Sequence, residues 1–379
     1  MESYATDSLQ ALPAPFWFIQ FFKVLGFVLH AVPMNLWYAG LPIAVWLLWR
    51  GSPSGKQFGR RLALQMPIII AFGINFGIVP LLFLQVAYSK AFYPATILMA
   101  HAWMTIIVLL IPAYYGVYLY SFGLKEDGEM TPVRRAGGWI AAGLFVVIGF
   151  LFANGLSLTT RVEGWRDLWM THSVGGAATG TALNVSDPTL WPRWLLMFGF
   201  ALLTTAAWSL VDGFWIGKKE GDDYHRWLHG FTVRLTLAGA IWATVAGAWY
   251  VVLGWSSATR SAMFLSPYVV LTIPTMVVPW APCLILSFWR PGELDRLKAT
   301  AVAGSQLGVL ALNAISRQIV QNVELRALFD GGVSSQPVDT QWGSLVLFLG
   351  TFLVAIGVIA WILLQVYRAG GTSAATTEV

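Results

Sequence analysis

The sequence has 379 residues, of which 57% are hydrophobic and only 11% are charged, and its mean hydropathy is +0.66. A soluble domain carries about 25% charged residues, so the composition excludes a soluble globular protein and indicates a chain embedded in the lipid bilayer. The net charge of +5 is explained by uneven loops rather than by nucleic-acid binding. The single cysteine, Cys283, excludes an internal disulfide and a multi-cysteine metal cluster.

Nine stretches of the sequence are long and apolar enough to cross a membrane, which takes about 20 residues for a helix. Together they predict an all-α integral membrane bundle in a single transmembrane domain, residues 1–379. In chain order they cover residues 16–49, 62–88, 93–122, 138–158, 191–216, 227–255, 263–289, 297–323 and 342–366. The first is too long for one straight span, so we expect Pro33 to bend it or its start to lie along the membrane surface.

The connecting segments predict the topology of the chain. Residues 164–173, GWRDLWMTHS, predict a short surface helix, and residues 367–379 predict a disordered tail. With the N-terminus outside and the C-terminus inside, the inner loops carry about twice as many Lys and Arg residues as the outer loops. We expect no cleavable signal peptide, and a multi-pass location in a bacterial-type cytoplasmic membrane.

Two of the five histidines lie inside apolar segments, where a polar side chain needs a partner or a purpose. His30 lies about halfway along the first segment, and His101 lies in the third. In the predicted topology both lie in the outer half of the membrane, as two axial ligands of one haem iron would. The alternative is that each histidine bonds a neighbouring helix or faces a water-lined cavity.

Other polar residues have more ordinary interpretations. His225 and His229 share a helix face and could bind a metal, but a solvated helix start explains them better. His172 is expected at the surface. An ion pair between Asp212 and Arg234 is predicted at the inner ends of adjacent helices.

Four further polar residues lie in apolar segments or at their ends. Arg317 could bind a haem propionate, or pair with Glu324 or a lipid phosphate. Asn75, Asn313 and Gln318 could bond neighbouring helices.

The chain resembles subunit I of the cytochrome bd quinol oxidases, remotely but over most of its length. FGINF at residues 72–76 resembles the opening of the family's second helix, and His30, with the kinked run to Gly40, resembles its haem-ligand histidine. SRQ at residues 316–318 resembles the family's GRQPW region and places Arg317 on the motif's arginine. The resemblance implies that His30, Arg317 and Asn75, within FGINF, belong to a cofactor site.

The departures from the family pattern are as informative. His101 stands where the family has a glutamate in helix three, with Leu109 at a second such position, and Ala314 replaces a helix-eight glutamate. The low-spin haem ligands of helices five and seven have no match. The long quinol-binding loop is reduced to residues 256–261. These losses imply that the chain is not an oxygen reductase by itself.

The resemblance therefore implies an electron-transfer subunit with one low-spin haem b held by His30 and His101. It would pass electrons between membrane quinone and an outer partner, such as a c-type cytochrome in another chain. Three alternatives stay open: a haem-free membrane anchor subunit of a larger respiratory complex, a transporter or proton channel, and an oxidase with altered ligands.

Overall fold

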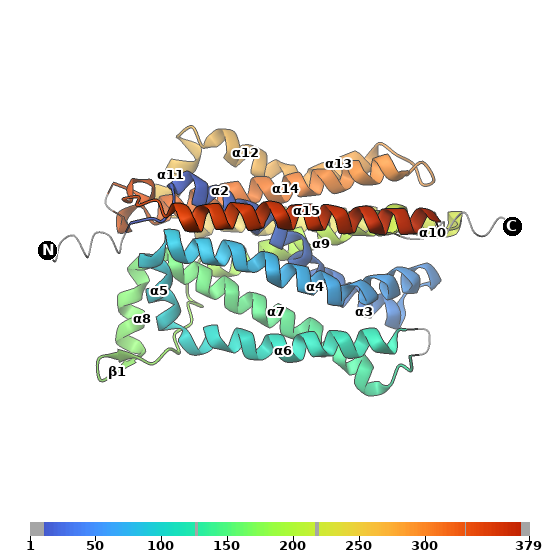
Figure 1. Cartoon of the computed structure of the whole chain (residues 1–379), viewed down its shortest axis with the longest axis horizontal. Coiled ribbons are helices and arrows are strands. Elements are labelled where there is room, and N and C mark those ends of the chain that lie inside the picture. The colour runs from blue at the N-terminus through green and yellow to red at the C-terminus, as the bar shows by residue number, and fades with distance from the viewer. Residues whose placement is uncertain (1–10, 126–127, 217–219, 330, 373–379) are drawn as a thin grey trace. The chain divides into compact units, whose positions relative to one another are not determined.

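The computed structural model describes residues 11–125, 128–216, 220–329 and 331–372. Within these ranges it contains nine helices that are long and apolar enough to cross a membrane (Figure 1). They cover Phe16–Arg50, Pro53–Ala87, Ala100–Gly123, Pro132–Thr160, Leu190–Ile216, Asp222–Gly254, Val269–Ser287, Arg296–Glu324 and Trp342–Ile362. The predicted helical membrane bundle is confirmed, and the protein is a multi-pass membrane protein.

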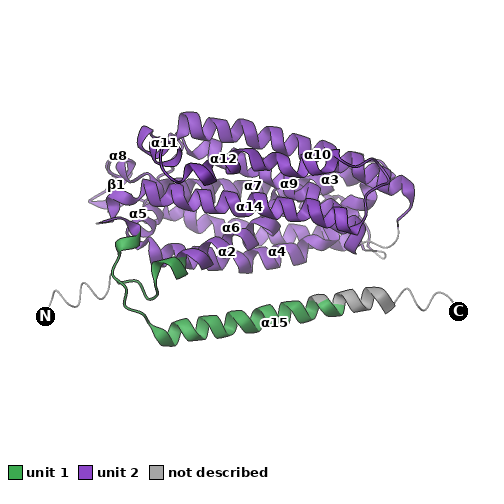
Figure 2. Cartoon of the chain, turned by 90° about the horizontal axis from the view of Figure 1, so that it is seen from above, with its two compact units in different colours: residues 1–19, 334–379 green, residues 20–333 purple. Residues whose placement is uncertain are grey.

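The chain divides into two units, residues 1–19 with 334–379, and residues 20–333 (Figure 2). The first unit contains the start of α2 (Phe16–Asn35) and all of α15 (Trp342–Thr372). A parallel bridge between Leu12 and Val338 joins its two segments. Helix α15 includes residues 367–372 of the predicted tail, and residues 373–379 lie outside the described part of the chain.

The second unit contains the remaining helices. These are α3 (Leu41–Arg50), α4 (Pro53–Ala87), α5 (Ser89–Leu98), α6 (Ala100–Gly123), α7 (Pro132–Thr160), α8 (Trp165–Thr171), α9 (Leu190–Val211), α10 (Asp222–Trp249), α11 (Ser257–Phe264), α12 (Val269–Val277), α13 (Ala281–Ser287) and α14 (Arg296–Glu324). Helix α8 is the predicted short surface helix. A small antiparallel hairpin, β1 (Ser173–Val174) with β2 (Ala177–Ala178), follows it.

Figure 1 shows α5, α8, β1 and α11 at one end of this unit, which we call the hairpin end. The turn between α3 and α4 lies at the opposite end.

Three spans contain a π-helical segment: η1 (Leu36–Gly40), η3 (Asp212–Ile216) and η4 (Tyr250–Gly254). In the first span, η1 begins three residues after Pro33, whose ring nitrogen cannot donate to a carbonyl one turn earlier. The helix therefore widens near Pro33 and then continues as α3. The first span is therefore irregular near Pro33, as predicted, and the irregularity is a π-helical turn.

Two other predicted spans are subdivided. The third was expected from residue 93, but Met99 leaves helical geometry between α5 and α6. The seventh was expected as one helix over residues 263–289. It consists of α12, the 3-10 turn η5 (Val278–Trp280) and α13. Pro279 and Pro282, which lack a backbone donor, lie at the starts of η5 and α13, whereas Pro274 lies inside α12.

Helix starts follow the expected capping chemistry. Ser52, Thr131 and Asp295 each accept a hydrogen bond from a backbone N–H in the first turn of α4, α7 and α14. Inside the second unit α9 packs along α10, where the buried Ser209 and Thr232 hydroxyls lie 2.9 Å apart. Short polar contacts of this kind bind membrane helices to one another.

Candidate functional site

His30 lies in α2 with its ring half-buried against α4. Its Nδ1 lies 2.7 Å from the backbone oxygen of Gly73. A carbonyl oxygen can only accept, so Nδ1 of the neutral ring carries the hydrogen and Nε2 keeps a free lone pair. Histidines that ligate metals usually have this arrangement, because the second hydrogen bond fixes both the tautomer and the ring orientation.

Two glycines of α4 make room for this contact. A Cβ atom added at Gly77 would lie 2.8 Å from Cε1 and Nδ1 of His30, and one added at Gly73 would lie 2.2 Å from the Trp37 ring. The Trp37 and His30 rings meet edge-on at 5.7 Å. The motif FGINFG therefore has a physical function in this chain, because its glycines, one helical turn apart, form the surface against which His30 packs.

The second predicted ligand, His101, lies in the first turn of α6 and is exposed. Its backbone N–H donates to Gly180, and a Cβ atom at Gly180 would lie 2.9 Å from its Nδ1. Across the described residues, no hydrogen bond or ring contact joins His101 to His30. The two histidines pack against different segments, and their pairing on one iron stays a prediction.

Asn75 is separated from His30 by the α4 helix itself. Residues 73 and 77 face α2, whereas Asn75, two residues from each, is exposed and donates to Ala71 of its own helix at 2.8 Å. It lines a shallow groove of about 330 Å³ between α4 and α6 together with Phe72, Tyr114 and four other residues. The structure therefore does not place Asn75 with the residues around His30.

Arg317 of α14 lies close to the His30 region. Its guanidinium stacks on the Phe27 ring at 4.5 Å, and Phe27 precedes His30 by one turn of α2. Arg317 is also close enough to His30 for its charge to act on the imidazole. No carboxylate in the described chain forms an ion pair with Arg317. Glu324, the alternative partner, interacts with Arg193 and Thr160 instead.

A polar cluster lies near Arg317, and of its members the sequence singled out only Gln318, which bonds the neighbouring helix α2 through Lys23 as predicted. Tyr88, between α4 and α5, accepts hydrogen bonds from Gln20 at 2.8 Å and Gln318 at 2.7 Å, and donates to Asn322. Lys23 of α2 lies over the Tyr88 ring, with its Nζ 4.4 Å from the ring centroid. The available signal was spacing, since Lys23 and His30 are seven residues apart on one face of a helix.

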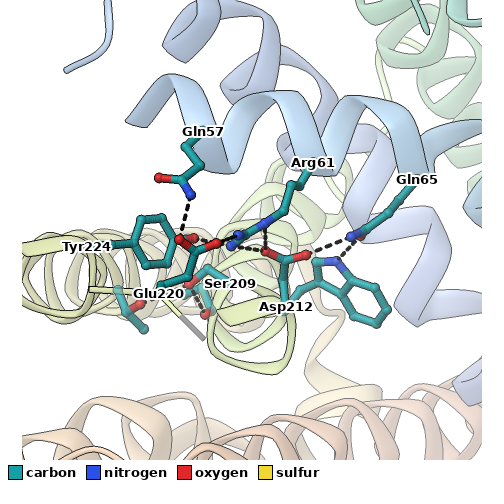
Figure 3. A network of polar contacts seen from close by, with 10 residues as sticks. Gln57, Arg61, Gln65, Ser209, Asp212, Glu220 and Tyr224 are labelled. Atoms are coloured by element: carbon teal, nitrogen blue, oxygen red, sulfur yellow. Dashed lines mark hydrogen bonds and ion pairs between the residues drawn. The ribbon is translucent and has the colours of Figure 1, made fainter. Parts of the chain in front are cut away.

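A second network lies at the opposite end of the unit (Figure 3). Arg61 of α4 forms an ion pair with the fully buried Asp212 at 2.7 Å and a second one with Glu220. Gln65 donates to the other Asp212 oxygen at 2.6 Å, and Arg61 donates to the Tyr224 hydroxyl at 2.5 Å. Both carboxylates share one guanidinium.

The predicted ion pair between Asp212 and Arg234 is wrong. Arg234 is exposed on α10, whereas Thr232 and Thr236 of the same helix are buried. Residues two apart on a helix face different directions, so Arg234 points away from the helix contacts and Arg61 takes its place.

The remaining histidines also have separate partners. The His225 ring stacks on Phe214 at 5.0 Å, whereas His229 lies 3.2 Å from the Trp289 carbonyl oxygen. His172 lies 3.2 Å from the Thr181 hydroxyl. In the part of the chain that the structure describes, no three His, Cys, Asp or Glu side chains gather as a metal site. A haem needs no such group, because one or two imidazoles hold its iron.

Comparison with known proteins gives a fold but no sequence family. No protein-family model matches the sequence, and no curated protein matches it. Among solved structures, a chain of the bd oxidase from Geobacillus thermodenitrificans is similar, with a TM-score of 0.64 at 11% sequence identity. The match covers 93% of this chain and 98% of that chain. At this identity the similarity establishes the shared fold alone.

Proposed function

We propose, from a fold shared with a bd oxidase chain, that this protein is an electron-transfer subunit of a respiratory complex in a bacterial-type cytoplasmic membrane. His30 and His101 would together hold the iron of one low-spin haem b. Electrons pass between membrane quinone and an outer partner, such as a c-type cytochrome. The subunit I resemblance of FGINF, His30 and Arg317 belongs to the same proposal.

One observation carries the proposal: the His30 ring donates through Nδ1 to Gly73 and so presents Nε2 as a fixed lone pair. The residues around it fit a haem in two further respects. Gly77 allows the His30 ring to take this position, because a Cβ atom there would lie 2.8 Å from the ring, and Arg317 supplies a cation without a carboxylate partner in the described residues. A bound haem would supply a reversible one-electron carrier at membrane depth.

The chain's own residues then have distinct tasks. His30 binds through Nε2, Gly73 holds its orientation, and Arg317 binds a propionate with its fork of N–H donors. If His101 takes the second axial position, no position remains for oxygen, which favours electron transfer over oxygen reduction.

A haem-free anchor subunit is the second candidate, and the position of His101 favours it. This ring is exposed and lies against Gly180 rather than His30. On this alternative, His30 is a packing residue held by Gly73, and the fold is kept for contacts with other subunits.

A reduced-minus-oxidised spectrum and a pyridine haemochrome assay on the purified protein test the proposal. We expect a sharp low-spin b-type α band that is lost in His30→Ala and lost or shifted to high spin in His101→Ala, because each variant removes one ligand. His172→Ala, a histidine outside the site, is the matched control. A featureless spectrum from folded protein would favour the anchor subunit. A spectrum unchanged in His101→Ala would show that His101 is not a ligand, and the bis-histidine hypothesis would be wrong.

A further inference from the structure

Lys23 is a buried cation whose hydrogen-bond partners are all neutral. Only 8% of the residue is exposed. Its Nζ donates to Oε1 of Gln318 and Oε1 of Gln321, both at 2.6 Å, and lies over the Tyr88 ring. A buried charge is costly unless an opposite charge lies beside it, and amide oxygens supply only part of that compensation.

Tyr88 does not supply the missing negative charge. Burial raises the pKa of its phenol well above the usual value near 10, so the hydroxyl stays protonated. The hydroxyl donates its hydrogen to Asn322, which agrees with a neutral phenol.

Arg317 adds a second positive charge to the same region. Its charge and that of Lys23 are close enough to repel each other. The described residues provide neither side chain with an ion pair. Arg317 also interacts with a further cation, Arg193, whose acidic neighbours are Glu324 and Asp187. Two like charges are therefore held together at the hairpin end in a medium of low dielectric constant, which favours a bound anion between them.

The position of these cations relative to His30 indicates the chemistry of that anion. Lys23, Phe27 and His30 are spaced four and three residues apart, so they lie along one face of α2, and Arg317 stacks on the middle member. Lys23 lies about 10 Å from His30 along the helix axis, at 1.5 Å per residue. A ligand whose metal is held by His30 and whose carboxylates extend from one edge would meet both cations.

We propose that Lys23 and Arg317 form a two-cation site for the carboxylates of the tetrapyrrole that His30 holds. Lys23 is the new member of this site and acts as a positioning residue, because it orients the macrocycle by its edge. The inference rests on the proposed haem function. A free dicarboxylate or inorganic phosphate has the same charge chemistry, so the test separates these sources.

The experiment compares two ligands that differ only in charge. Haem-depleted full-length protein is titrated with protohaem and with protohaem dimethyl ester, whose propionates are neutral. We expect the wild-type chain to bind the free acid about tenfold more tightly than the ester. Lys23→Gln, whose amide can still donate to Gln318 and Gln321, should lose most of this preference, and Lys23→Arg should keep it. Lys90→Gln, which removes an exposed lysine at the same end, is the matched control.

Each outcome has one meaning. Equal binding of acid and ester by the wild-type chain would overturn the two-cation site and leave the haem function intact. An equal preference in Lys23→Gln and wild type would overturn the role of Lys23. Binding of neither ligand by folded wild-type protein would overturn the proposed function itself.

A second measurement tests whether a free anion occupies the site, and a second variant replaces Lys23→Gln if that protein does not fold. Stabilisation of the haem-depleted chain by succinate or phosphate, without an acid-over-ester preference, would overturn the tetrapyrrole as occupant. If Lys23→Gln is not recovered folded, Arg317→Gln makes the same acid-against-ester comparison on the other cation. Its preference should fall as well, and an unchanged preference would overturn the site.

Discussion

The two ends of the helical unit differ in how their buried charges are paired. At the α3–α4 end, one guanidinium, Arg61, has ion pairs with two carboxylates, Asp212 and Glu220. At the hairpin end, two cations, Lys23 and Arg317, lie near each other with amide and aromatic partners. In the first network each carboxylate has a cation beside it, whereas in the second neither cation has a carboxylate partner among the described residues. Buried cations without a carboxylate partner are suited to a ligand of the opposite charge.

The largest expected effect comes from removing Arg61 from its ion pairs with Asp212 and Glu220. Arg61→Met leaves the fully buried Asp212 without its cation, so we expect a loss of about 3 kcal/mol in the free energy of unfolding. Denaturant titration in mixed micelles measures it. The double variant Arg61→Met/Asp212→Asn should recover part of the loss, since it removes the fully buried carboxylate and leaves only the part-exposed Glu220 without its cation. An unchanged free energy of unfolding in Arg61→Met would show that water compensates Asp212. The contrast between the two ends of the unit would then be wrong.

The next largest effect concerns the surface on which His30 packs. Gly77→Val places a branched side chain where a Cβ atom alone would lie 2.8 Å from the imidazole. We expect a loss of about 1–3 kcal/mol in stability and loss of the haem α band. Gly143→Val is the control, because a Cβ atom there has no other atom within 4 Å. Full haem occupancy in Gly77→Val would show that His30 is not a haem ligand.

The smallest effect has the opposite sign and tests the comparison most directly. Lys23→Gln in haem-depleted protein removes a buried charge that lacks an anion. Its free energy of unfolding should be unchanged or higher by up to about 1 kcal/mol. The same denaturant titration decides it. A loss as large as that of Arg61→Met would show that Lys23 is compensated within the chain.

The sequence predicted features that depend on composition and local pattern. In the described part of the chain nine helices correspond to the nine apolar stretches, and the short helix over Trp165–Thr171 follows from its interfacial composition. Breaks inside spans were harder to predict. Pro33, Pro80 and Pro274 lie inside helices, whereas Pro279 lies at the start of the 3-10 turn that divides a span. The outcome depends on whether neighbouring helices satisfy the freed carbonyl groups.

The candidate site was predicted only in part, because its decisive contacts link distant residues. The sequence singles out His30 as a polar residue in an apolar helix, but a backbone oxygen such as that of Gly73 leaves no trace in residue identity. Lys23 and its acceptor Gln318 are 295 positions apart. The error on Asp212 has the same origin, since Arg234 was chosen from an adjacent helix while Arg61 approaches from an earlier one.

The π-helical segments have a consequence for aligning this sequence with others. A π turn closes its hydrogen bond over one more residue than an α turn, so a helix can absorb a one-residue insertion there and continue along the same axis. A segment of this kind, residues 36–40, lies between His30 and α3, and another ends the span of α9. An ungapped alignment across such a point is out of phase by one residue beyond it, rotating every later side chain by about 100° in register. Two chains can therefore share a backbone path even where an ungapped alignment of their sequences detects no similarity.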